Sequence, residues 1–236
     1  MWSLRKDRKG FTGLEAAIVL IAFVTVAAIF SYVMLGAGFF TAQKGKQSVD
    51  TGVKQASSSI ELDGQYIYLE ANQTGSNGDV EKISFYVTLS AGGTPVDLKQ
   101  TVLAIRYQNY YKQIPYGTYY NTTAGPGNTT TITDWTGYTV DDTTGGVTYN
   151  GSTVGYLLWW YKGIVSVDEN GYDNLLEKNE KYKIIINTTA IKDGYTDITT
   201  LPKTNDYLTI ELKPSIGAPL IINKDIPPSL TKLTWV

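Results

Sequence analysis

The chain has 236 residues, a formal net charge of −2, 18% charged residues, and neither histidine nor cysteine. It therefore lacks the usual zinc and copper ligands, the usual proton shuttle, the thiol nucleophile and any disulfide. The mildly acidic composition argues against a nucleic-acid partner. A serine triad would have no base, and no phosphate-binding glycine motif precedes a helix. These features favour a protein that is not an enzyme and needs no cofactor or metal.

A long apolar run follows a short basic leader. Residues 16–40 carry no charge, and the basic residues that precede them are Arg5, Lys6, Arg8 and Lys9. As a helix this run would extend roughly 37 Å, which is enough to cross a bilayer core of about 30 Å. It is too long for an ordinary secretory signal peptide and has no alanine-type cleavage box after it. The charge asymmetry predicts a cytoplasmic amino end and a chain that lies mostly outside the membrane.

The helical pattern continues beyond the apolar run. Apolar residues then recur on one helical face, and polar ones occupy the others, as the spacing of Ala42, Val49, Val53, Ala56 and Ile60 indicates. This predicts a helix from about residue 12 to residue 62, ended by Asp63-Gly64, with a bend near Gly45 or Gly52. We therefore expect three parts: a leader (1–10), a long hydrophobic helix (11–62) and an extracellular domain (63–236).

Glu15 is a carboxylate at the edge of the apolar run. In a hydrocarbon phase it would cost several kcal/mol unless it were paired. Cleavage between Gly10 and Phe11 would create an α-amino group four residues before it. That amine could neutralise Glu15 on the same helix or on a neighbouring subunit. Alternatively, Glu15 lies solvated in the headgroup layer, and residue physics alone leaves these readings open.

The leader and helix resemble the class III signal peptide and amino-terminal helix of archaeal flagellins (archaellins), which belong to the type IV pilin superfamily. The resemblance rests on the basic residues, Gly10, residues 11–23 and residues 30–40. A weaker match covers residues 210–214 and 217–220 with Pro227. The strong match spans about a quarter of the chain.

The resemblance implies cleavage after Gly10, before Phe11, by a membrane-embedded prepilin-type signal peptidase. It also implies a helical filament with the hydrophobic helices bundled at its centre, as a homopolymer or mixed with related subunits. Gly13 and Glu15 become the candidate assembly residues, and Glu15 matches the pilin-type glutamate at mature position five. Not every archaellin has a glutamate there, so the carry-over of its role is weaker than that of the cleavage site.

From residue 65 the pattern changes to short strands with alternating β-branched and aromatic residues, separated by turns. The expected strands cover residues 65–69, 82–89, 102–109, 135–140, 156–167, 181–187, 207–213, 219–222 and 230–236. This spacing favours an all-β, immunoglobulin-like sandwich. The expected fold class is thus α+β, a long amino-terminal hydrophobic helix followed by that sandwich.

Residues 118–153 are rich in threonine and glycine, which predicts long surface loops or an insertion. The chain contains five Asn-x-Ser/Thr acceptors, and three of them fall in this segment. On an exported domain they predict N-glycans on the filament surface. The acceptors are Asn72, Asn121, Asn128, Asn150 and Asn187.

Two other features have simpler explanations than a ligand site. The cluster Trp159-Trp160-Tyr161 fits the core and rim of the sandwich, and a sugar-binding platform is the less favoured reading. Residues 168–174 are dense in oxygen ligands but lack the spacing and terminal glutamate of a calcium loop. Turn chemistry at Asn170-Gly171 accounts for that segment.

The resemblance implies a structural subunit of an extracellular archaeal surface filament used for swimming, made as a membrane-inserted precursor. One alternative is an adhesive pilin of the same superfamily. The other is an uncleaved, membrane-anchored surface domain that binds a ligand such as a sugar. Processing at Gly10 separates that last alternative from the first two.

Overall fold

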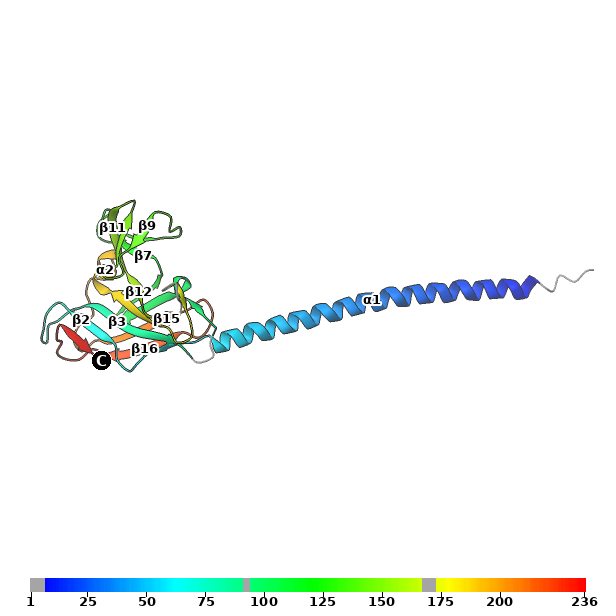
Figure 1. The fold of residues 1–236 in the computed structure, drawn as a ribbon, viewed down its shortest axis with the longest axis horizontal. Coiled ribbons are helices and arrows are strands. Elements are labelled where there is room, and N and C mark those ends of the chain that lie inside the picture. Colours follow the sequence, from blue (N-terminus) through cyan, green and yellow to red (C-terminus); the bar gives the residue numbers. More distant parts are fainter. Residues whose placement is uncertain (1–6, 91–93, 167–172) are drawn as a thin grey trace, which may run out of the picture. The chain divides into compact units, whose positions relative to one another are not determined.

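A computed structural model describes residues 7–90, 94–166 and 173–236, and for residues 7–12, 56 and 57 it describes the backbone alone. The chain forms two compact units, one ending at Gly52 and one beginning at Val53. Figure 1 shows a long helix in the first and packed strands in the second. The expected fold class, a long apolar helix followed by antiparallel β-structure, is confirmed.

Helix α1 spans Asp7–Ser57. The three threonine hydroxyls of this helix that the structure describes all form hydrogen bonds within it. Thr25, Thr41 and Thr51 donate to the backbone carbonyls of Ala22, Ala37 and Gln47 at 2.9, 2.8 and 2.8 Å. Because a helix also satisfies its backbone groups internally, this segment presents few polar groups that need water.

The helix ends five residues earlier than the periodicity predicts. Ile60 belongs to strand β1 (Ile60–Leu62), where it lies opposite Leu89. The serines between Ala56 and Ile60 explain the stop, because serine side chains compete for backbone hydrogen bonds and disfavour helix interiors. Ile60 continues the helical spacing after these serines, but one apolar residue does not indicate another helical turn. Asp63-Gly64 therefore follows a strand rather than the helix.

Two antiparallel sheets build the main β-sandwich. The six-stranded sheet has the order β12-β14-β3-β2-β17, with β1 also paired to β3, and the four-stranded sheet has the order β16-β15-β5-β6. The six-stranded sheet contains β12 (Trp159–Val165), β14 (Lys181–Asn187), β3 (Val80–Leu89), β2 (Tyr68–Ala71) and β17 (Leu233–Trp235). The other sheet contains β16 (Leu220–Asp225), β15 (Tyr207–Lys213), β5 (Val102–Tyr107) and β6 (Tyr110–Pro115).

Both sheets contribute to one hydrophobic core. Phe85 and Ile184 from the six-stranded sheet are fully buried in it, together with Ile105 and Ile210 from the four-stranded sheet. Burial alternates along β3 and β14, as expected for strands with one face on a core. The predicted strands at 181–187 and 207–213 match β14 and β15. A bend at Leu158 divides the predicted strand 156–167 between β11, which ends at Leu157, and β12, which begins at Trp159. The last residue of that predicted strand lies outside the described residues.

The sequence predicts long surface loops or an insertion over residues 118–153, and the loop alternative is wrong, because short strands run through the segment. This segment contributes four whole strands and the start of the fifth to a separate five-stranded sheet, ordered β8-β7-β11-β10-β9. We call this sheet the small sheet. Its strands are β7 (Thr118–Asn121), β8 (Thr129–Thr131), β9 (Tyr138–Val140), β10 (Gly146–Tyr149) and β11 (Ser152–Leu157). A second core of Tyr119, Ile132, Val147, Leu157 and Trp160 supports it. Threonine is a good strand former, so its abundance here reflects strands as well as exposure.

Short elements complete the domain. Helix α2 (Thr188–Gly194) follows β14, and a 3-10 turn, η1 (Leu98–Gln100), precedes β5. A two-stranded ribbon pairs β4 (Val96–Asp97) with β13 (Leu175–Leu176). None of these was predicted, because each is too short to show a hydrophobic period.

Candidate functional site: the exposed helix and the surface acceptors

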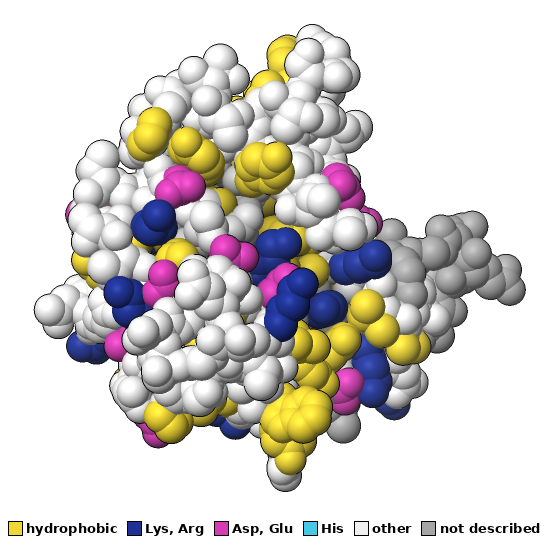
Figure 2. Space-filling view, turned by 90° about the vertical axis from the view of Figure 1, so that its left-hand side faces the viewer, with side chains coloured by type: hydrophobic (Ala, Val, Ile, Leu, Met, Phe, Trp, Pro, Cys, Tyr) yellow, Lys and Arg dark blue, Asp and Glu magenta, His cyan; other side chains and the backbone are white. Residues whose placement is uncertain are grey.

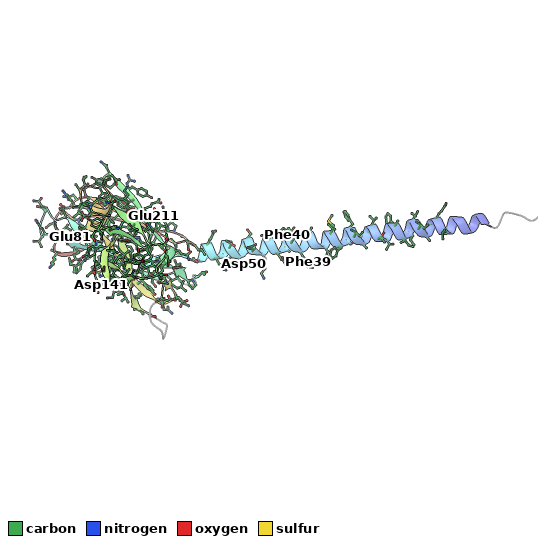
Figure 3. The ribbon with its side chains drawn as sticks, turned by 90° about the horizontal axis from the view of Figure 1, so that it is seen from above. Phe39, Phe40, Asp50, Glu81, Asp141 and Glu211 are labelled. Atoms are coloured by element: carbon green, nitrogen blue, oxygen red, sulfur yellow. The ribbon has the colours of Figure 1, made fainter. Side chains whose placement is uncertain are left out.

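Between Leu14 and Phe40 the surface of α1 is apolar on all sides, with Glu15 as its one charged residue, and it is uncovered. Its large hydrophobic side chains between Leu14 and Phe40 are 58% to 80% exposed. Figure 3 labels Phe39 and Phe40, which stand free along the helix. A helix that is apolar all round is stable only when buried in a membrane or among other helices. This helix is therefore built to be covered by something else.

Length and composition would allow one helix in the described part of the chain to cross a membrane. The segment concerned, Gly13–Gln55, has a most apolar window of mean hydropathy 2.7, and none of that window is buried. Gly13, Gly36 and Gly38 have no atom within 4 Å of the place where a Cβ would lie. Small residues allow helices to approach closely where hydrocarbon offers no hydrophobic drive. The helix thus suits both a bilayer and a helical bundle.

Glu15 lies exposed on α1, within the apolar stretch. Among the described residues, no lysine or arginine forms an ion pair with it. The backbone of Gly10 and Phe11 is part of α1, but their side chains and the leader residues 1–6 lie outside what the structure describes. Residues four apart on a helix are neighbours, so an amine on Phe11 would lie on the same face as Glu15.

Four of the five glycan acceptors are at the surface of the β domain. Asn72, Asn128 and Asn150 are exposed and Asn121 is half-buried. The Asn121 Oδ1 accepts from the amides of Thr123 and Ala124 at 3.0 and 3.1 Å, an arrangement that uses the oxygen and not the nitrogen to which a glycan would be attached. Asn150 adopts φ 48° in the β10–β11 turn, a conformation that asparagine tolerates well.

Asn187 differs from the other acceptors. It is only 9% exposed, and its Oδ1 caps α2 by accepting from the Ala190 amide at 2.9 Å. A buried capping side chain has a structural role that explains its presence. In the folded domain little of its side chain is accessible.

The tryptophan pair belongs to the interior, as predicted. Trp159 and Trp160 are 0% and 1% exposed. Each indole donates to a carbonyl at 2.9 Å, Trp159 to Ile114 and Trp160 to Asp142. Because both rings are enclosed and hydrogen-bonded, neither forms a sugar-binding platform.

Beside this pair, Tyr116 makes aromatic contacts with both the main sandwich and the segment of the small sheet. It stacks on Trp135 at 5.5 Å and contacts the edge of Trp159 at 5.3 Å. Burial raises the pKa of the Tyr116 phenol to about 12. Tyr116 thus packs between the main sandwich and the loops of the small sheet.

The segment that forms the small sheet has acidic but no basic residues. The nearby cations come from elsewhere in the chain: Lys99 lies 5.4 Å from the Trp135 ring, and Lys162 adds to the hydrogen bonds that lower the pKa of Asp141. Residues 113–161 contain Asp134, Asp141 and Asp142 but no lysine, arginine or glutamate. A backbone hydrogen bond from Thr136 holds the pKa of Asp134 below its usual value, and a side-chain hydrogen bond from Thr144 does the same for Asp141. These two carboxylates therefore stay ionised well into the acidic range.

Within residues 7–90, 94–166 and 173–236, no three histidine, cysteine or acidic side chains gather as they would to hold a metal ion. Most of the oxygen-rich segment at 168–174 lies outside the described residues, so its turn reading stays a prediction.

Comparison with known proteins gives a consistent family. The archaeal-type flagellin profile matches residues 10–224. Two relatives from Archaeoglobus fulgidus are "Probable flagellin 2", 50% identical over 99% of this chain and 97% of its own, and "Probable flagellin 1", 38% identical over 97% and 95%. A solved structure of the archaeal flagellum of Methanospirillum hungatei is similar with a TM-score of 0.57 and 29% identity, covering 92% of this chain and 95% of that one. The chain belongs to the archaeal-type flagellin family.

Proposed function

We propose that the chain is the structural subunit of a helical extracellular filament used for swimming. The observation that carries the proposal is α1, a helix of 51 residues whose apolar stretch from Leu14 to Phe40 is exposed. In a filament, neighbouring copies of the helix would cover this surface, with small residues at the closest approaches. Family membership supports the same conclusion, and it assigns no catalytic role.

Processing is the second part of the proposal. The subunit would be inserted in the membrane as a precursor through residues 16–40 and cut by a prepilin-type signal peptidase between Gly10 and Phe11. The mature parts would then be the assembly helix, Phe11 to Ser57, and the β domain that follows. The freed amine of Phe11 would neutralise Glu15 of the same or an adjacent copy as the helix leaves the lipid.

The third part concerns the outer surface. We propose N-glycans on the exported domain at Asn72, Asn121, Asn128 and Asn150. Their surface position supports this assignment, and the buried cap Asn187 is left out. Glycans there would shield the outside of the filament.

Amino-terminal sequencing and intact-mass measurement of sheared surface filaments test all three parts. We expect sedimentable filaments, a mature start at Phe11 and a mass above that of the bare polypeptide. An intact Met1 start found only in membranes would overturn the filament proposal and favour an anchored surface domain. Filaments whose subunits have the mass of the bare polypeptide would overturn only the glycan part of the proposal. Loss of swimming, with attachment retained, in a deletion strain separates swimming from the adhesive alternative.

A further inference from the structure

A row of aromatic and lysine side chains crosses the outward face of the six-stranded sheet, and we call it the aromatic–lysine row. In the order of the strands it consists of Trp235, Tyr68, Tyr86, Lys183 and Lys162. Trp235 lies opposite Tyr68, whose ring meets Tyr86 at 5.9 Å. Lys183 lies opposite Tyr86, with its ammonium 5.9 Å from the ring centroid. The row therefore spans five neighbouring strands.

The apolar end of the row is unusually open. Trp235 is 70% exposed and Leu233, its neighbour on the same face of β17, is 59% exposed. On the opposite face of the sheet, Leu69 and Phe85 are fully buried in the core. Isolated exposed apolar residues are common on protein surfaces, but a tryptophan continuous with tyrosines is typical of the centre of a protein interface.

The edge beside Trp235 also offers backbone groups. Ile67 and Val236 exchange both of their hydrogen bonds, at 2.9 and 3.0 Å. By the alternation of an antiparallel ladder, the amides of Leu233 and Trp235 point away from β2 toward the open edge. The carbonyl of Leu233 is occupied by the Thr231 hydroxyl at 2.7 Å, which limits strand addition. Side-chain docking on the face is therefore favoured over extension of the sheet.

The lysine end of the row lacks a direct ion pair. Lys162 and Lys183 lie opposite each other in adjacent strands, and like charges in this position destabilise a sheet. Among the described residues, no carboxylate lies within ion-pair distance of either one. Lys162 does act at longer range on Asp141, whose pKa it lowers slightly. Additional carboxylates brought by a partner would relieve this repulsion. On the face that Figure 2 shows, basic side chains lie next to both hydrophobic and acidic ones.

The small sheet of another copy has the complementary character. Its segment from 113 to 161 has three aspartates and no basic residue, and the rings of Tyr138 and Tyr149 pack there in a tilted pair with centroids 4.6 Å apart. The row is aromatic with two lysines at one end and the exposed Glu70 opposite Leu233 at the other, and the small sheet is aromatic with three aspartates. Contacts between two different patches of the same chain are heterologous, and they generate open helical assemblies when the rotation does not close.

We propose that the aromatic–lysine row of one subunit docks on the small sheet of a neighbouring copy, forming a contact in the outer shell of the filament. This inference rests on the filament function proposed above. Opposite charges would set the register of the two patches, and burial of Trp235 with Leu233 would stabilise the contact. The occupant of the exposed face is therefore a second copy of this chain.

Because the natural chain has no cysteine, single introduced cysteines report contacts unambiguously. Cells would produce two differently tagged full-length chains, one with Leu233→Cys and one with Asp142→Cys, that assemble into mixed filaments. A long-armed bis-maleimide is applied to the sheared filaments, and linked heterodimers are identified by mass. Each chain carries one cysteine, so every crosslink joins two subunits.

The matched control replaces Leu233→Cys with Asn223→Cys, an exposed position on β16 of the other sheet. We expect at least fivefold more heterodimer with Leu233→Cys than with Asn223→Cys. Equal yields in intact filaments would overturn the docking contact while leaving the filament function standing. Links between two Leu233→Cys chains alone would also overturn it, because they indicate a symmetric contact. A chain that forms no filaments even without substitutions would instead contradict the proposed function.

Discussion

The amide of Ala218 donates to the carbonyl oxygen of Ser58 at 3.0 Å, which fixes the chain where it leaves α1 to the loop before β16. Gly217, the preceding residue, has φ +107°, and a Cβ atom built on it would collide with that same carbonyl. Ser58 is 1% exposed, so it has little freedom to move away. The junction therefore requires glycine at position 217 for both its backbone conformation and its space.

Gly217→Ala is expected to destabilise the β domain by about 2–4 kcal/mol, through the positive φ and the collision together. Gly64→Ala is the matched control, because Gly64 has φ +104° but open space around it. The control should lose only about 1–2 kcal/mol. Thermal unfolding of the full chain in detergent, followed by near-ultraviolet circular dichroism, measures both. Equal losses would mean that the collision is relieved by movement of Ser58.

Asn187 tests the distinction between a cap and a glycan acceptor. Asn187→Ala removes the acceptor for the Ala190 amide and should cost about 1 kcal/mol. Asn187→Asp also destroys the sequon but keeps the capping oxygen, so its stability should stay close to that of the natural chain. Neither variant should change the glycan mass of the filaments. A mass loss in both variants would show that position 187 is modified after all.

Alkaline pH should lower the stability of the β domain through ionisation of Tyr116. Burial raises its pKa from 10.0 to about 12, so the folded state holds this proton more tightly than the unfolded state. The corresponding stability is fully present below pH 10 and is lost as pH rises from 10 toward 12. The slope from one such group is at most about 1.4 kcal/mol per pH unit. Burial also raises the pKa of Tyr107 and Tyr161, which adds to the loss.

The melting temperature measured against pH, together with tyrosinate absorbance, checks this pH dependence. Tyr116→Phe removes one titrating group while keeping the ring, so the decline above pH 10 should become shallower. An unchanged slope would assign the alkaline loss to other groups.

Glu15→Gln should impair assembly without blocking processing. The variant removes the charge that the Phe11 amine would neutralise, so mature subunits should accumulate in the membrane while filament mass falls. Asp50→Asn is the matched control, since Asp50 is also an exposed carboxylate on α1 but lies beyond the apolar run. Sheared filament mass is compared with mature subunit left in the membrane. The same ratio in both variants would favour a solvated Glu15 with no part in assembly.

Sequence reasoning recovered the elements whose periods are long and regular. The alternation of Ile83, Phe85, Val87 and Leu89 identified β3, because all four side chains face the core. The apolar run identified α1. The strand is buried on one face, which gives alternating apolar residues, and the helix is apolar on all faces, which gives a continuous apolar run. Both patterns can be read directly from the sequence.

The predicted strands at 135–140 and 156–167 overlap β9 and the end of β11, but β7, β8 and β10 of the small sheet were not predicted, because hydrophobicity does not reveal what holds them together. The strand Thr129–Thr131 is held by its pairing with β7 and by the contact between the hydroxyls of Thr118 and Thr131 at 2.9 Å. Such strands read as polar loops until their partners are known. Likewise, Leu233 and Trp235 alternate as a strand should, but only the pairing with β2 shows that they face outward.

The lysine-free, arginine-free composition of the small sheet also governs how this protein can be digested. Trypsin has no cleavage site between Lys112 and Lys162, so Asn121, Asn128 and Asn150 fall on one long peptide. A tryptic map would report their glycans together, and often not at all, whereas a protease that cuts beside aromatic residues would separate them. The same composition would leave this part of a shed filament intact in surroundings where trypsin-like proteases are abundant.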